Sequence, residues 1–130
     1  PNKFFSQEDP TMNDALTFGT ILAFLLPALA GIQADCIVIN MVLHHTPAPA
    51  QVLADAAAHL APGGVIAVTD LCRHDQGWAR ENCGDLWLGF EPEQLTGWAA
   101  DAGLGDLASS FLAQRNGFQV QVRLFGHATQ

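Results

Sequence analysis

The chain has 130 residues, a formal net charge of −8 and an apolar fraction of 49%, which is enough for an ordinary buried core. This length is typical of one domain. The cations are few and form no cluster along the chain, so we expect neither a nucleic acid nor an anionic membrane surface as a partner of this chain. They are Lys3, Arg73, Arg80, Arg115 and Arg123.

An uncharged apolar run, Ala15 to Ile32, follows a polar start. Its length is close to the minimum for a membrane span. A signal peptide needs a positive segment before such a run, whereas acidic residues precede this one. We therefore predict a buried helix that ends near Pro27, with a membrane tether as the alternative. The chain then divides into an arm with an apolar helix, 1–34, and an α/β domain, 35–130, and we expect it in the cytoplasm.

From Asp35 the pattern indicates a strand, a helix and a second strand. "DCIVINMV" is a continuous apolar, β-branched run, typical of a strand buried on both faces. Ala50 to Leu60 carries an i, i+3, i+4 apolar stripe, and Pro62-Gly63-Gly64 ends this helix. Val65 to Leu71 is then a second buried strand. This order predicts a βαβ unit with two parallel strands.

Two helices and a hairpin are predicted after this unit. The helices span about Trp78 to Trp87 and Glu91 to Ala102. The strands are Leu107–Gln114 and Phe118–Gly126, and the Asn-Gly pair between them is a strong hairpin signal. "FQVQVRLF" alternates apolar and polar residues, which predicts an antiparallel edge strand with one wetter face.

The order of these motifs resembles the second half of a class I S-adenosylmethionine-dependent methyltransferase. Leu43-His44-His45 is followed by Leu60-Ala61-Pro62-Gly63-Gly64 and then by a strand that ends at Asp70. The later stretch "RHDQGWARENCGDLWLGFEPEQLTGWAADAGL" is similar to methyltransferase domains found behind arsenic-repressor-type winged helices in bacteria. The resemblance covers about Leu26 to His127. It implies an α/β, Rossmann-like methyltransferase fold, second half, with parallel strands and a terminal antiparallel hairpin.

The resemblance also implies a function. The cofactor would be S-adenosylmethionine, and the partner a small-molecule methyl acceptor that is methylated on O, N, S or arsenic. The rival hypothesis is a non-catalytic methyltransferase-like module for dimerisation or ligand sensing. No Gly-x-Ser-x-Gly motif is present, so a hydrolase has no support.

One part of the family pattern is missing from this sequence. The family holds its cofactor with a loop of the form D/E-x-G-x-G-x-G, which does not occur here. We therefore expect an incomplete or diverged fold that binds S-adenosylmethionine weakly by itself. The strand at Cys36–Asn40 would also lack a neighbour on one side, which predicts a homodimer.

Candidate site residues follow from the rule that open α/β sheets bind ligands beyond the carboxyl ends of their strands. The resemblance implies that Asn40, Met41 and Leu43 contact the cofactor. It places His44 or His45 near the methyl-transfer site, where an imidazole could take the acceptor's proton. The alternative is that these histidines cap the strand end by bonding to the backbone.

Asp70 and His74 are predicted to contact the substrate. Asp70 could instead be a strand-end residue bonded to the loop, and Asp75 suits the N-cap of the following helix. The cysteines Cys36, Cys72 and Cys83 lack metal-site spacing and indicate reduced thiols, so no metal site is expected. A soft-metal or arsenic site of Cys72, His74 and Cys83 is the alternative.

Overall fold

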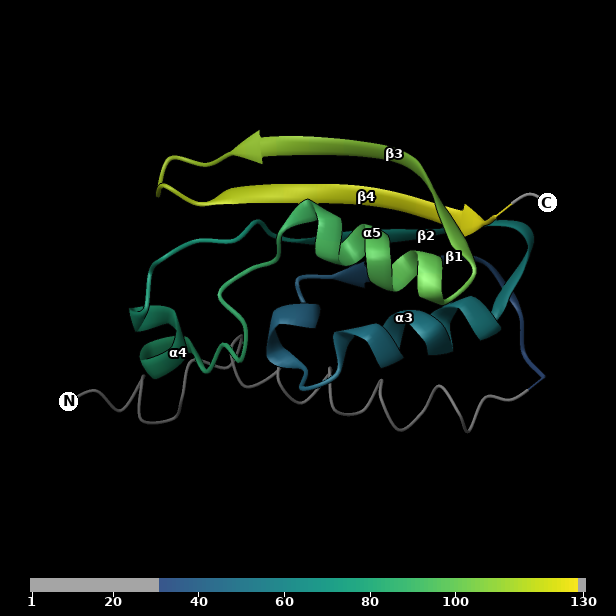
Figure 1. The fold of residues 1–130 in the computed structure, drawn as a ribbon, viewed down its shortest axis with the longest axis horizontal. Helices are drawn as coiled ribbons and strands as arrows, with labels where there is room; N and C mark the ends of the chain where they lie inside the picture. The colour runs from purple at the N-terminus through teal and green to yellow at the C-terminus, as the bar shows by residue number, and fades with distance from the viewer. Residues whose placement is uncertain (1–30, 129–130) are drawn as a thin grey trace.

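The computed structural model describes residues 31–128, which form one mixed α/β sheet with its helices (Figure 1). The sheet order is β1-β2-β4-β3. The β1 and β2 strands are parallel, whereas β4 is antiparallel to both β2 and β3. Their bounds are β1 Ala34–Asn40, β2 Leu60–Leu71, β3 Leu104–Ala113 and β4 Gln119–His127. The predicted fold class, a parallel pair with a terminal antiparallel hairpin, is confirmed.

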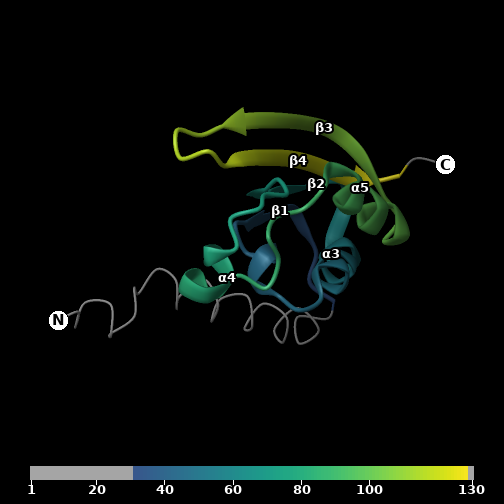
Figure 2. The same cartoon turned by 60° about the vertical axis from the view of Figure 1, so that its left-hand side comes forward.

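Two helices, α3 (Pro49–Ala58) and α5 (Pro92–Asp101), pack on the same side of the sheet (Figures 1 and 2). Each begins with a proline in its first turn, where the missing N–H costs nothing. The Glu91 N–H donates to Gln94 Oε1 at 2.8 Å and so fixes the start of α5.

The core lies between these helices and the sheet. Its fully buried residues include Ile39, Leu43, Leu53, Ile66, Phe90, Leu95 and Phe125.

The remaining helical segments lie at the carboxyl end of the parallel strands. They are the short 3-10 turn η1, Leu43–His45, and the helix α4, Trp78–Cys83. The helix predicted to reach Trp87 ends earlier because Gly84 adopts a left-handed conformation with φ 73°.

The second strand starts earlier than predicted. Ala34 pairs with Leu60 and Cys36 pairs with Val65, so the residues around Pro62-Gly63-Gly64 bulge out of the ladder while the strand continues. The helix ends earlier, at Ala58, and Pro62-Gly63-Gly64 lies within β2, so the prediction that these residues end the helix is wrong.

The prediction that "FQVQVRLF" forms an edge strand is wrong. The strand β4 lies between β2 and β3, and β3 forms the edge. Its polar face is covered: Gln121 and Arg123 are buried, and Gln121 Nε2 donates to the Phe90 carbonyl at 2.9 Å. Polar alternation marks a face with hydrogen-bond partners here, not a face in water.

The predicted apolar helix falls outside the described residues except for its last positions. Among residues 31–128, no helix has the length and apolarity needed to cross a membrane.

Candidate functional site

The site forms where the two parallel strands end side by side. The Met41 N–H donates to the Thr69 carbonyl at 2.7 Å, which joins the end of β1 to β2. Met41 has a backbone φ of 56°, in the left-handed region that is uncommon for residues other than glycine. Residues with such backbone angles are concentrated at functional sites. The chain turns there into η1, which carries both adjacent histidines.

His44 and Asp70 form a buried pair across this edge. His44 Nδ1 lies 2.6 Å from Asp70 Oδ1, and the His44 backbone N–H donates to Oδ2 at 3.3 Å. The Leu71 N–H donates to Oδ1 at 2.8 Å. Asp70 is 0% exposed and His44 is 5% exposed. The carboxylate is therefore held by three donors inside the protein.

The pair fixes the state of the His44 ring. Burial lowers the pKa of His44, but the hydrogen bond and negative charge of Asp70, with the charge of Asp85, raise that pKa above its ordinary value. In the neutral ring, a proton on Nδ1 facing Asp70 leaves the lone pair on Nε2. His44 is thus an oriented base of increased basicity.

His45 and Asp85 lie beside this pair. The two imidazole ring centroids are 4.2 Å apart. Asp85 Oδ1 lies 3.7 Å from both His44 Nε2 and His45 Nδ1. Burial, followed by the neighbouring His44, lowers the pKa of His45, although Asp85 and the Gly84 backbone oppose this. Burial also raises the pKa of Asp85, against the effect of the nearby histidines.

The segment that carries Asp85 is bonded to the strand end. The Leu86 and Trp87 N–H groups both donate to the His44 carbonyl, at 2.9 and 3.1 Å. Trp87 Nε1 donates to the Thr46 carbonyl at 3.0 Å. Asp85 received no role from the sequence, because nothing in its spacing indicates that the loop after α4 returns to η1.

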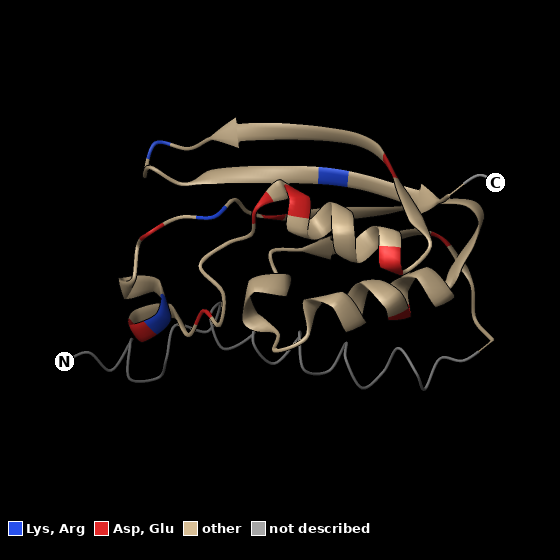
Figure 3. Cartoon of the chain, in the orientation of Figure 1, with Lys and Arg blue, Asp and Glu red and all other residues tan. Residues whose placement is uncertain are grey.

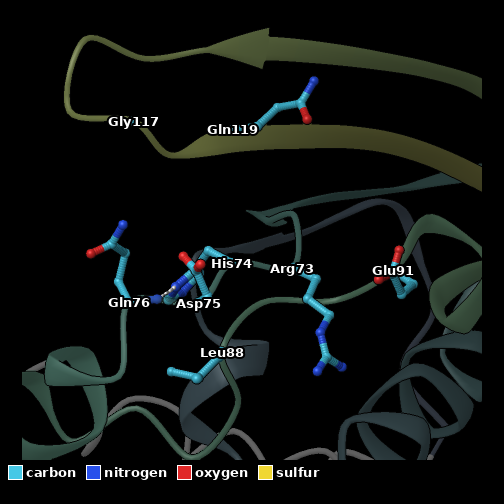
Figure 4. A pocket seen from close by; sticks show the side chains of 8 residues that line it. All are labelled: Arg73, His74, Asp75, Gln76, Leu88, Glu91, Gly117 and Gln119. Carbon is cyan, nitrogen blue, oxygen red and sulfur yellow. Dashed lines mark hydrogen bonds between the residues drawn. The ribbon is translucent and has the colours of Figure 1, made fainter.

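A polar cleft opens between the segment that follows β2 and the tip of the hairpin (Figure 4), and neither His44 nor Asp70 lines it. His74 accepts a hydrogen bond at Nδ1 from the Gln76 N–H at 3.1 Å and packs edge-on against the Phe118 ring. Its buried Nε2 has no hydrogen-bond partner among the described residues. Burial lowers the pKa of His74, opposed by the charge of Asp85. The lining residues are Arg73, His74, Asp75, Gln76, Leu88, Glu91, Gly117 and Gln119.

The structure separates the alternatives for several predicted residues. The complete burial of Asp70 favours the strand-end role over direct substrate contact. The N-cap of α4 is Gly77, so the predicted capping role of Asp75 is wrong. Leu43 is 0% exposed and its side chain belongs to the core. Asn40, by contrast, is exposed at the strand end.

Charged side chains elsewhere are spread out. The described Lys and Arg positions lie on different segments (Figure 3). Arg123 is buried. Cys72 is buried and Cys36 is exposed. Within residues 31–128, Cys72, His74 and Cys83 do not form a group with metal-ligand spacing.

Comparison with known proteins identifies the family. The model of a methyltransferase domain family matches residues 2–120, so the chain belongs to that family. The family model also matches residues before Leu26, which lie outside the part of the sequence that carries the motifs of the resemblance. The cofactor that this family implies is S-adenosylmethionine. A search of curated proteins finds no match.

Several solved structures share the fold. The [4+2]-cyclase SpnF matches with a TM-score of 0.61 and 13% identity, over 75% of this chain and 51% of that chain. A putative sarcosine dimethylglycine methyltransferase from Galdieria sulphuraria matches with a TM-score of 0.61 and 16% identity, over 72% and 52%.

A third match is the Burkholderia thailandensis 1,6-didemethyltoxoflavin-N1-methyltransferase, solved with S-adenosylhomocysteine. Its TM-score is 0.59 at 20% identity, over 73% of this chain and 44% of that chain. This chain thus spans about half the length of the cyclase and of the Galdieria sulphuraria protein. At these identities the likeness shows the fold alone.

The end of β1 fits one side of such a cofactor. Asn40 presents an exposed amide there, and the left-handed turn at Met41 directs the chain away from the strand axis. Both lie where open α/β sheets bind ligands. Among residues 31–128 no glycine-rich loop accompanies them.

Proposed function

We propose that the chain is an S-adenosylmethionine-dependent methyltransferase domain that acts on a small molecule, with His44 as the general base. The observation that carries this proposal is the buried His44–Asp70 pair at the carboxyl ends of β1 and β2, with 2.6 Å between Nδ1 and Oδ1.

The pair suits removal of a proton from a methyl acceptor. When bound, S-adenosylmethionine would supply an electrophilic methyl group from its sulfonium and leave as the neutral thioether S-adenosylhomocysteine. As the acceptor's O, N or S atom takes this group, His44 Nε2 accepts the acceptor's proton and the ring becomes positively charged. Asp70, bonded at Nδ1, stabilises that charge and keeps the ring in place. Asn40 and Met41 would contact the cofactor.

The cleft supplies a place for the acceptor. Gln76, Glu91 and Gln119 line it with hydrogen-bonding groups, and Leu88 adds an apolar wall (Figure 4). This mixture suits a small polar molecule. In this arrangement His74 is a contact residue for the acceptor, since it lines the cleft.

The fold by itself does not determine the reaction, because one protein of this fold is a [4+2]-cyclase. The support therefore comes from the base. The resemblance to domains that accompany arsenic-repressor-type regulators adds trivalent arsenic to the candidate acceptors.

The test is methyl transfer from S-adenosylmethionine with a labelled methyl group, supplied in excess, to phenols, amines, thiols and arsenite. We expect His44→Asn to reduce turnover about a hundredfold, with S-adenosylhomocysteine affinity nearly unchanged. Asp70→Asn should also reduce turnover, since it removes the charge that stabilises the protonated ring.

His59→Asn is the matched control, because His59 bonds to the Ile32 carbonyl, away from the site. Equal losses of thermal stability and turnover in His44→Asn would favour the capping role. Binding of S-adenosylhomocysteine without transfer to any acceptor would favour the ligand-sensing module.

A further inference from the structure

A second arrangement at the strand ends points to a metal ion. His44, His45 and Asp85, named here the buried triad, each place one ligand atom within 4.8 Å of the others. Their side chains are 7% exposed or less. We propose that the buried triad binds one divalent transition-metal ion through His44 Nε2, His45 Nδ1 and a carboxylate oxygen of Asp85.

The distances suit a shared metal better than direct hydrogen bonds. Asp85 Oδ1 lies 3.7 Å from His44 Nε2 and 3.7 Å from His45 Nδ1, and both distances are too long for hydrogen bonds. Ligands about 2.0–2.2 Å from one zinc ion lie about 3.3–3.6 Å apart in tetrahedral geometry. Small side-chain shifts would therefore bring the three atoms to coordination distance.

An unsatisfied atom gives independent support. His45 Nδ1 is buried and forms no hydrogen bond of regular geometry among the described residues, although the Gly84 backbone acts on the same side chain. Leaving such a nitrogen unpaired costs roughly 1–3 kcal/mol. A metal ion on the side of Asp85 would satisfy His45 Nδ1 and balance the carboxylate at the same time.

The surroundings of the buried triad also match a metal site. A ligating histidine commonly donates its other ring N–H to a carboxylate, which sets the tautomer. Asp70 occupies this position at His44 Nδ1. The Asp85 loop is held in register by the Leu86 and Trp87 N–H groups, which both donate to the His44 carbonyl. Two of the ligands are thus tied together by backbone bonds.

The ligand set defines the class of metal. Two imidazoles and a carboxylate suit Zn²⁺, Fe²⁺, Co²⁺ or Ni²⁺, whereas Mg²⁺ and Ca²⁺ favour oxygen ligands alone. Three protein ligands leave a position for water or another small ligand.

The metal and the proposed base use the same lone pair on His44 Nε2. A bound ion therefore excludes proton transfer at that atom, so the metal-bound form would be inactive in base catalysis. The proposal itself rests on the geometry of the buried triad and does not require that methyl transfer occurs.

The experiment uses the untagged chain, freed of metal with a chelator and titrated with Co²⁺. We expect one equivalent to bind, with the visible absorption of four- or five-coordinate Co²⁺ that has nitrogen and oxygen ligands. Zn²⁺ should displace the Co²⁺ and raise Tm. His45→Asn and Asp85→Asn should each weaken binding more than a hundredfold, and Asp70→Asn about 10–100-fold.

His59→Asn should bind like the unmodified chain. Three results would overturn the proposal: no stoichiometric Co²⁺ binding, equal weakening by His59→Asn, or intense thiolate-to-Co²⁺ absorption that assigns the ion to cysteine. The wild-type spectrum decides even if a variant fails to fold. Methyl transfer by a chain that binds no metal would refute this site and leave the proposed function standing.

Discussion

Gly89 lets two loop backbones meet next to the site. A Cβ at this position would lie 2.2 Å from the Cys72 carbonyl oxygen, and φ is 75°. The segments on either side are joined by backbone bonds, from the Phe90 N–H to the Leu71 carbonyl and from the Arg73 N–H to the Phe90 carbonyl, each 3.0 Å. This close approach keeps the segment around Gly89 beside the residues that follow β2.

We predict that Gly89→Ala destabilises the chain by on the order of 3 kcal/mol, because it combines a backbone clash with a strained φ. Urea unfolding measures the change. Gly97→Ala is the control, because Gly97 lies in α5 and an added Cβ there has nothing within 4 Å. This substitution should increase the free energy of unfolding by roughly 0.5–1 kcal/mol. A neutral Gly89→Ala would mean that the two backbones are not in contact.

At the scale of single residues, the sequence could identify parts of the site but not their relationships. The motif placed His44, His45 and Asp70 near strand ends, and the structure brings these three residues together. The pairing of His44 with Asp70 could not be predicted, because it depends on strand register and on which ring points inward. Asp85 was missed because the predicted helix ran through it to about Trp87, whereas α4 ends at Cys83 and the chain turns at Gly84.

The helix α5 is tied to the hairpin through one buried cation. Arg123 donates to the Pro92 carbonyl at 3.0 Å and to Thr96 Oγ1 at 2.6 Å. It also donates to Gln121 Oε1 at 3.1 Å and forms an ion pair with Asp106 at 2.5 Å. The guanidinium therefore links α5 to both β3 and β4.

We predict that Arg123→Met lowers the free energy of unfolding by about 3 kcal/mol, because buried acceptors lose their donor while the volume is largely kept. Asp106→Asn should cost no more than about 1 kcal/mol, since the Asp106 side chain is 36% exposed and water can solvate it. Thermal and urea unfolding of the two variants test the ranking. Equal effects would contradict a buried linking role for Arg123.

At the scale of elements, local patterns predicted the βαβ unit, the helix from Glu91 to Ala102 and the Asn-Gly hairpin. These elements depend on apolar periodicity, prolines and turn residues, which act over a few positions. The place of β4 in the sheet was predicted wrongly, because Gln121 and Arg123 look the same in sequence whether water or buried protein groups accept their hydrogen bonds. Their partners come from residues about thirty positions away.

The whole described sheet has an open side at β1. Within residues 31–128, β1 pairs only with β2, and Val38 is 63% exposed on it. An apolar edge of this kind invites pairing with another chain. We propose that two copies associate through β1.

Light scattering at several concentrations should then show a dimer whose fraction increases with concentration, and Val38→Lys should shift it toward monomer. A substitution on the opposite edge strand, Ser109→Lys, is the control, since it adds the same charge on β3. A monodisperse monomer with slow amide exchange at Ile37 to Ile39 would show instead that this chain covers its own edge.

The strand order described above also sets a sequence of events during synthesis. The β1-α3-β2 unit joins segments close in the chain, so it can form early on the ribosome. The β3 strand leaves the ribosome next but has no described neighbour except β4, which inserts between β2 and β3. Until β4 has emerged, β3 has no described strand partner and remains exposed. Nascent chains in which β3 is outside the exit tunnel while residues 119–127 are still inside it should therefore be the form that chaperones and proteases recognise.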